Sequence, residues 1–64
     1  MRRYMAFADT GRDFIEFVFN SEHRANSKGN YEDAIRAYRR MYGYYNKNIK
    51  IKNTRKLDTN EEIF

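Results

Sequence analysis

Residues 3–19 read RYMAFADTGRDFIEFVF, and this stretch decides the fold. Its first part, residues 3–8, alternates in the manner of a β-strand, with apolar side chains on both of its sides. A strand that is apolar on both sides is typical of the interior of a sheet. We therefore expect residues 3–8 to form a central strand.

The residues that follow have the chemistry of a turn and then of a second strand. Residues 9–12 read DTGR, which places Asp at the entry of a turn and Gly where a positive φ is needed. Residues 13–19 are rich in β-branched and aromatic side chains. The pattern predicts a β-hairpin in which Ile15, Phe17 and Phe19 share one face.

The apolar period then changes from 2 to 3.6 residues. After a polar loop over residues 20–29, apolar side chains follow one helical face, which predicts a helix over residues 31–42. Asn30, with Asp33 three residues later, resembles an N-cap, and Ser27 is a competing cap one turn earlier. Gly43 suits the position after the last helical residue. The side chains that we expect this helix to bury are Ile35, Tyr38, Met41 and Tyr42.

Alternation returns in residues 48–57, where Ile49 and Ile51 alternate with lysines, as in a strand with one buried face. The element order is therefore β-β-α-β. A right-handed crossover through the helix places the third strand beside the first and gives the sheet order 2-1-3. We expect an α+β fold with two layers, in which the helix packs on one face of a three-stranded sheet. Residues 1–57 form this single domain, and residues 58–64 form an acidic C-terminal tail.

The length and composition limit the remaining choices. A chain of 64 residues makes one domain that buries about 60% of its unfolded surface, so self-association as a homodimer would help its stability. The chain has no cysteine, so the core must come from its six tyrosines and five phenylalanines. No apolar run approaches the roughly 20 residues of a membrane helix. These features fit a soluble protein of the cytoplasm.

The distribution of charge is the strongest functional signal. Residues 35–57 contain eight basic residues and no acidic residue, whereas residues 1–34 carry five basic and six acidic residues. A surface of one sign favours nucleic acid or an acidic protein as its partner. Lysine on an edge strand also protects against aggregation, so a solvated surface is the alternative explanation. The eight candidate binding residues are Arg36, Arg39, Arg40, Lys47, Lys50, Lys52, Arg55 and Lys56.

Two further basic residues flank the expected start of the helix. Arg24 and Lys28 lie beside the sequence SKGN at residues 27–30, where a hydroxyl, a lysine and free helix N–H groups could hold a phosphate. The spacing of a Walker A motif is missing. Ordinary helix capping is the alternative for this segment.

No set of residues suggests catalysis, a metal site or a cofactor. The DTG tripeptide at residues 9–11 is also used by aspartic proteases, but that chemistry needs two adjacent carboxylates, and a hairpin turn explains the same residues. His23 is the single histidine, without a nucleophile or an orienting acid in a recognisable pattern. We therefore expect a protein that is not an enzyme.

One helix can cover only one face of the sheet. We expect Tyr4, Phe14 and Val18 to lie on the uncovered face, opposite Phe7, Phe17 and Phe19. An uncovered aromatic face serves either as a platform for stacking bases or as a surface for protein docking.

In its size, element order, charge and lack of cysteine, the chain is similar to small phage-encoded proteins that take over host machinery, such as polymerase inhibitors and anti-CRISPR proteins. The resemblance includes no motif, so it carries over no functional residue. Many such inhibitors are acidic mimics of DNA, and this chain departs from them in being basic. The resemblance implies a non-catalytic protein that docks on a host nucleic-acid machine and inhibits or modulates it. The alternative is an autonomous module that binds DNA or RNA by backbone contacts and aromatic stacking.

Overall fold

The computed structural model describes residues 2–43 and 48–57. Its elements follow the order β1 (Arg2–Asp9), β2 (Phe14–Ser21), α1 (Lys28–Tyr42) and β3 (Lys50–Lys56). The sheet order is β2-β1-β3, and β1 pairs with both neighbours in antiparallel fashion. The predicted α+β architecture and strand order are confirmed.

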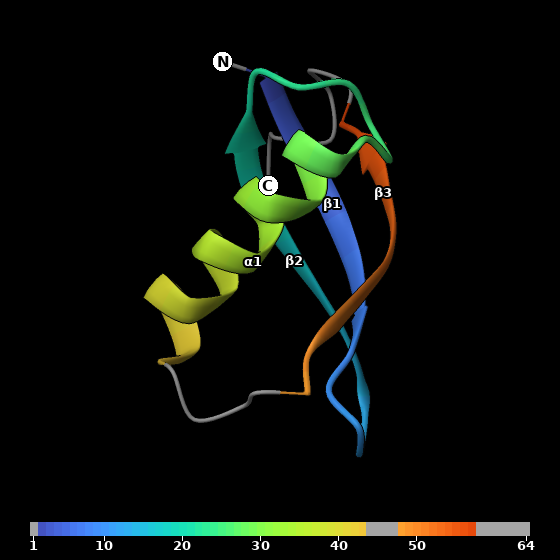
Figure 1. Ribbon diagram of the computed structural model, residues 1–64, viewed down its shortest axis with the longest axis vertical. Coiled ribbons are helices and arrows are strands. Elements are labelled where there is room, and N and C mark those ends of the chain that lie inside the picture. The colour runs from blue at the N-terminus through green and yellow to red at the C-terminus, as the bar shows by residue number, and fades with distance from the viewer. Residues whose placement is uncertain (1, 44–47, 58–64) are drawn as a thin grey trace.

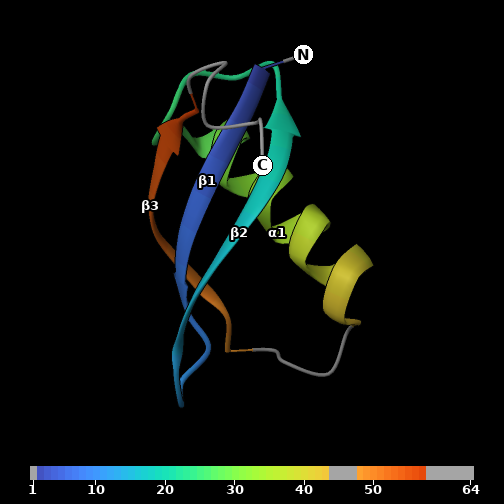
Figure 2. The ribbon, with the colours of Figure 1, turned by 180° about the vertical axis from the view of Figure 1, so that it is seen from behind.

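The helix lies on one face of the sheet and connects two parallel edge strands (Figure 1). Seen with α1 in front, β2 lies on the left of β1 and β3 on its right, so the crossover is right-handed. The helix starts beside the end of β3 and runs diagonally, so that its C-terminal end projects past β2 (Figures 1 and 2). The view from behind shows that, among the described residues, no helix covers the other face of the sheet.

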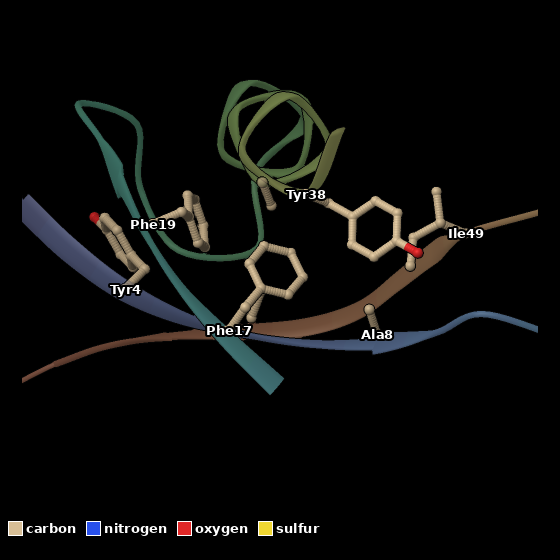
Figure 3. Packing of buried hydrophobic residues seen from close by; sticks show 8 residues of the cluster. Tyr4, Ala8, Phe17, Phe19, Tyr38 and Ile49 are labelled. Carbon is tan, nitrogen blue, oxygen red and sulfur yellow. The ribbon is translucent and has the colours of Figure 1, made fainter. Parts of the chain in front are cut away.

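The core lies between the helix and the sheet and is mostly aromatic (Figure 3). Tyr4 stacks on Phe19 with their ring centroids 5.6 Å apart, and Phe17 packs against Tyr38 at 5.9 Å. Small side chains of β1 leave the room that these rings need. The buried hydrophobic residues of this core are Tyr4, Ala6, Ala8, Phe17, Phe19, Ala34, Tyr38 and Ile49.

Two aromatic residues of β1 lie on the opposite side of the sheet from the one predicted. Tyr4 is buried under the helix, although we expected it on the uncovered face, and Phe7 is on the uncovered face, although we expected it in the core. The reason is the hairpin register, which pairs Tyr4 with Phe19 and Phe7 with Glu16. Directly paired residues of neighbouring strands share a face.

The helix also differs from the sequence prediction in its start and in its buried face. It begins at Lys28, three residues earlier than predicted, and Ser27 is its N-cap. Asn30 is therefore not a cap but a fully buried residue inside the first turn. Tyr38 is buried as expected, and Ile35 is only partly buried.

The end of the helix is more exposed than predicted. Met41 and Tyr42 are 49% and 54% exposed, because the last turn has run past the edge of the sheet. Gly43 follows with φ of 88°, and its N–H donates to the carbonyl of Arg39 over 2.8 Å, which ends the helix as predicted.

Candidate functional site

The basic residues of β3 form the first candidate surface. All four, namely Lys50, Lys52, Arg55 and Lys56, are exposed, and the strand contains no acidic residue. β3 is an edge strand, so one of its sides has no neighbouring strand. We call these four residues the β3 basic row. A row of cations on a rigid strand is a suitable contact for phosphates or for an acidic protein surface.

A β-bulge disturbs the middle of this row. β1 pairs Phe7 with Asn53 and Ala8 with Ile51, so Lys52 has no partner residue in β1. An extra residue in one strand bends that strand and increases its twist. Lys50 is paired with Asp9 across the sheet, on the face that the helix does not cover.

The basic residues of the helix form a separate group. Arg36, Arg39 and Arg40 are all exposed, and Arg36 and Arg40 lie one turn apart on the side of the helix that faces β2. The Arg36 guanidinium is 2.9 Å from Oδ1 of Asp33, in an ion pair whose arginine side chain is 68% exposed. An exposed pair of this kind adds little stability, but it offsets much of the charge that Arg36 presents to a partner.

Arg36 and Arg40 line one wall of a groove between the helix and β2. The other wall is the end of β2 and the residues after it, from Val18 to His23. Ala37 and Met41 add apolar surface to the helical wall. This groove, which we call the β2 groove, therefore combines an open strand edge, apolar side chains and arginine. Sequence reasoning missed it, because a groove at this place depends on how far the helix overhangs the sheet.

The two basic groups lie on different elements, one on the helix and the other on an edge strand of the sheet. α1 projects past β2, while β3 forms the other edge of the sheet (Figures 1 and 2). The structure therefore does not gather the predicted basic residues into one patch. Lys47, the remaining residue of the predicted set, lies outside the described residues.

Arg24 and Lys28 are exposed beside the start of the helix, as a phosphate site would need. The hydroxyl of Ser27, however, is used locally: it donates to the carbonyl of Arg24 and accepts from the N–H of Asn30. The Tyr31 N–H donates to the Ser27 carbonyl. These contacts are helix capping, the alternative considered for this segment.

A buried polar network fixes the loop between β2 and α1 to β3. Thr54 Oγ1 donates to Oδ1 of Asn30 over 2.6 Å, and Asn30 Nδ2 donates to the carbonyl of His23. Asn26, with φ of 63°, exchanges two bonds with Thr54: its N–H donates to Oγ1, and its Oδ1 accepts from the Thr54 N–H. Asn30 and Thr54 are 0% and 2% exposed. In the described residues, every buried side-chain nitrogen or oxygen has a partner.

This network was not predicted, because it joins residues 24 and 28 positions apart. The one local signal was the density of Asn and Ser in the loop, since these side chains hydrogen-bond readily to nearby backbone. Some of the residues that we considered as candidates for chemistry belong to this network, and their role in it is structural. We assign to it the positioning of the loop.

The other candidates for chemistry serve the fold. The Asp9 carboxylate accepts from the N–H of Gly11 over 2.8 Å, and Gly11 has φ of 93°, so the DTG tripeptide forms the hairpin turn. The His23 ring lies against Gly29 so closely that an added Cβ would be 2.6 Å from its Cγ. Within residues 2–43 and 48–57, no three His, Cys, Asp or Glu side chains are grouped to hold a metal ion.

No protein-family model, curated protein or solved structure matches this chain. Among the residues that the structure describes, no helix has the length and apolarity needed to cross a membrane. The function must therefore be inferred from the β3 basic row and the β2 groove.

Proposed function

We propose that this protein is a small non-catalytic binding protein, of the kind that phages encode, which docks on a host nucleic-acid machine and inhibits or modulates it. The observation that carries this proposal is the placement of two unlike surfaces at opposite edges of one rigid sheet. The β3 basic row offers cations to a polyanion. The β2 groove offers Met41 and Arg40 to a protein surface with apolar and acidic side chains.

Opposite placement allows one small domain to contact a protein and the nucleic acid that it holds at the same time. Linking two weak contacts in this way raises the overall affinity well above that of either contact alone. A polymerase or a CRISPR nuclease offers both partners close together. Inhibition then needs no catalytic residue, because occupying the path of the nucleic acid is enough.

The experiment uses purified bacterial RNA polymerase in a transcription assay and a purified CRISPR nuclease in a DNA-cleavage assay. The parent protein should inhibit one of these machines and bind it directly. Met41→Glu tests the β2 groove, and Lys50→Glu/Lys52→Glu tests the β3 basic row, because all three side chains are accessible. Each variant should weaken inhibition by about tenfold or more, as expected for the loss of a central interface contact. Arg2→Glu is the control, since Arg2 belongs to neither surface.

If the parent binds neither machine, with or without nucleic acid, the proposal is wrong. If it binds nucleic acid but neither binds nor inhibits either machine, the second candidate holds, which is an autonomous nucleic-acid-binding module. That candidate is favoured by the strand β3, which has the four cations of the β3 basic row and no acidic residue among its seven positions. A bandshift with DNA and with RNA at two salt concentrations separates the two functions.

A further inference from the structure

On the face of the sheet that the helix does not cover, basic, acidic and aromatic side chains are unevenly distributed. Register places four β1 residues on it, namely Arg3, Met5, Phe7 and Asp9, because the residues that alternate with them, Tyr4, Ala6 and Ala8, are buried under the helix. Their partners on the same face are Asn20, Val18, Glu16 and Phe14 in β2 and Arg55, Asn53 and Lys50 in β3. We call this set the open face.

Most cations of the open face are on β3, whereas its aromatic rings are on β1 and β2, and the exception is Arg3 at the start of β1. Its cations on β3 are Lys50 and Arg55, and the exposed Lys52 lies between them in the strand. Its two aromatic rings, Phe7 and Phe14, are on β1 and β2. The acidic residues Asp9 and Glu16 are also on β1 and β2, and Asp9 is engaged by the hairpin turn. A polyanion would therefore lie along β3 and not along β2.

Phe14 is the most exposed large hydrophobic residue of the described chain, at 81%. It begins β2 directly after the hairpin turn, and that turn is held by several short-range bonds. Thr10 Oγ1 accepts from the N–H of Asp13, and the Thr10 N–H donates to the Asp13 carbonyl. A ring held in water by a rigid turn has its exposure fixed before any partner arrives, which lowers the entropic cost of binding.

We propose that the open face binds single-stranded nucleic acid, with bases stacked on Phe7 and Phe14 and the phosphate backbone along Lys50, Lys52 and Arg55 of β3. This inference rests on the proposed function and names the polyanion and its site. Stacking on aromatic side chains needs unpaired bases, whereas a duplex keeps its bases stacked on each other. Asn53, paired with Phe7, adds an amide that can donate to and accept from the edge of a base.

The test measures the fluorescence anisotropy of a labelled oligothymidylate of about 15 nucleotides, a length within the range of one small binding domain. The full chain should bind this strand more tightly than a duplex of the same length. Phe14→Ala should weaken binding about fivefold or more, the usual loss when one stacking ring is removed. Phe14→Tyr keeps a ring and should bind as the parent does. Because Phe14 is so exposed, neither change should alter the melting temperature.

Two charge-matched variants test the path of the backbone. Lys50→Gln/Lys52→Gln should weaken binding and reduce the slope of log K against log salt by about 1.4, the value for two lost phosphate contacts on a single strand. Arg36→Gln/Arg40→Gln removes the same charge from the helix and should leave that slope unchanged. Equal effects of the two variants would mean that net charge alone governs binding, and the inference would be overturned.

The remaining outcomes are also decisive. Duplex binding as tight as single-strand binding, with Phe14→Ala unchanged, would overturn the stacking role. No binding of the oligonucleotide at low salt would overturn the inference as a whole. The transcription and cleavage assays test the proposed function without this oligonucleotide, so inhibition of a machine together with no binding of the oligonucleotide would contradict this inference alone.

Discussion

The two edges of the sheet solve the same problem in different ways. An edge strand leaves backbone N–H and C=O groups without partners, and these groups invite pairing with another chain. β3 carries four cations in seven residues, and Asn26 also binds its outer edge at Thr54. β2 has one charged residue, Glu16, in eight positions, and its end faces a groove under the overhanging helix.

The comparison bears on why β3 is so basic. Edge protection is the simplest explanation of lysine on an edge strand. The Asn26 contact, however, already occupies the Thr54 N–H, so β3 is less open to strand pairing than its position suggests. β2, the less protected edge, has no lysine or arginine. Cations placed where protection is less needed favour a binding role for the β3 basic row.

The largest expected effect on the free energy of unfolding comes from the helix, which packs on the sheet to which both edges belong. Tyr38→Ala should lower the free energy of unfolding by about 3–5 kcal/mol, because it removes a buried ring packed on Phe17 and leaves a cavity. Tyr42→Ala, four residues later on the same helix, is the control and should cost far less, since Tyr42 is 54% exposed. Urea denaturation followed by circular dichroism measures both. Equal losses would contradict the assigned core.

A smaller effect is expected from opening the protected edge. Thr54→Val should cost about 2 kcal/mol, because it leaves Oδ1 of buried Asn30 without its donor and the Asn26 N–H without its acceptor. Thr54→Ser keeps the hydroxyl and should recover most of this loss. Amide hydrogen exchange of residues 22–27 should be faster in the valine variant. If exchange there is unchanged, the network does not hold the loop.

The smallest effect on stability is expected at the unprotected edge. Val18→Lys gives β2 the kind of charge that β3 has, at a partly buried site on the open face, and should change stability by no more than about 0.5 kcal/mol. It should reduce concentration-dependent association, as measured by sedimentation velocity. Lys50→Val is the reciprocal variant, because it removes a charge from β3. The remaining protection of that edge stays in place, so association should increase less than it would for a strand edge without protection. A monomeric parent at all concentrations would remove the premise that β2 is the weaker edge.

The fold was predictable from sequence because each element has its own apolar period. The sides of β1 were harder to predict, since both sides of that strand are apolar. The hairpin register was the missing information: pairing Asp9 with Phe14 places Tyr4 opposite Phe19, and hence in the core. The helix start was misjudged at Asn30 because its side chain is held by Thr54, a residue 24 positions away. No local pattern contains that contact.

The candidate surfaces were predictable in part. Sequence identified the basic residues and their separation from acidic ones, but it could not say that Arg36 and Arg40 line a groove with β2 while the other basic group lies on the edge strand β3. That arrangement follows from the diagonal course of α1. The ion pair between Arg36 and Asp33 has an ordinary i, i+3 spacing that was visible in the sequence.

The sheet order has a consequence for how the protein is made. β1 is the central strand, yet one of its two neighbours, β3, leaves the ribosome after the other strands that the structure describes. The β1–β2 hairpin can pair as soon as it emerges, whereas the other side of β1 has no partner until the helix and β3 have been synthesised. During that interval a nascent chain exposes an apolar strand edge. The sheet is complete once β3 has paired and Thr54 has made its contacts with the loop. Codons that slow translation between the helix and β3 lengthen the interval before this step, so they should lower the yield of folded protein.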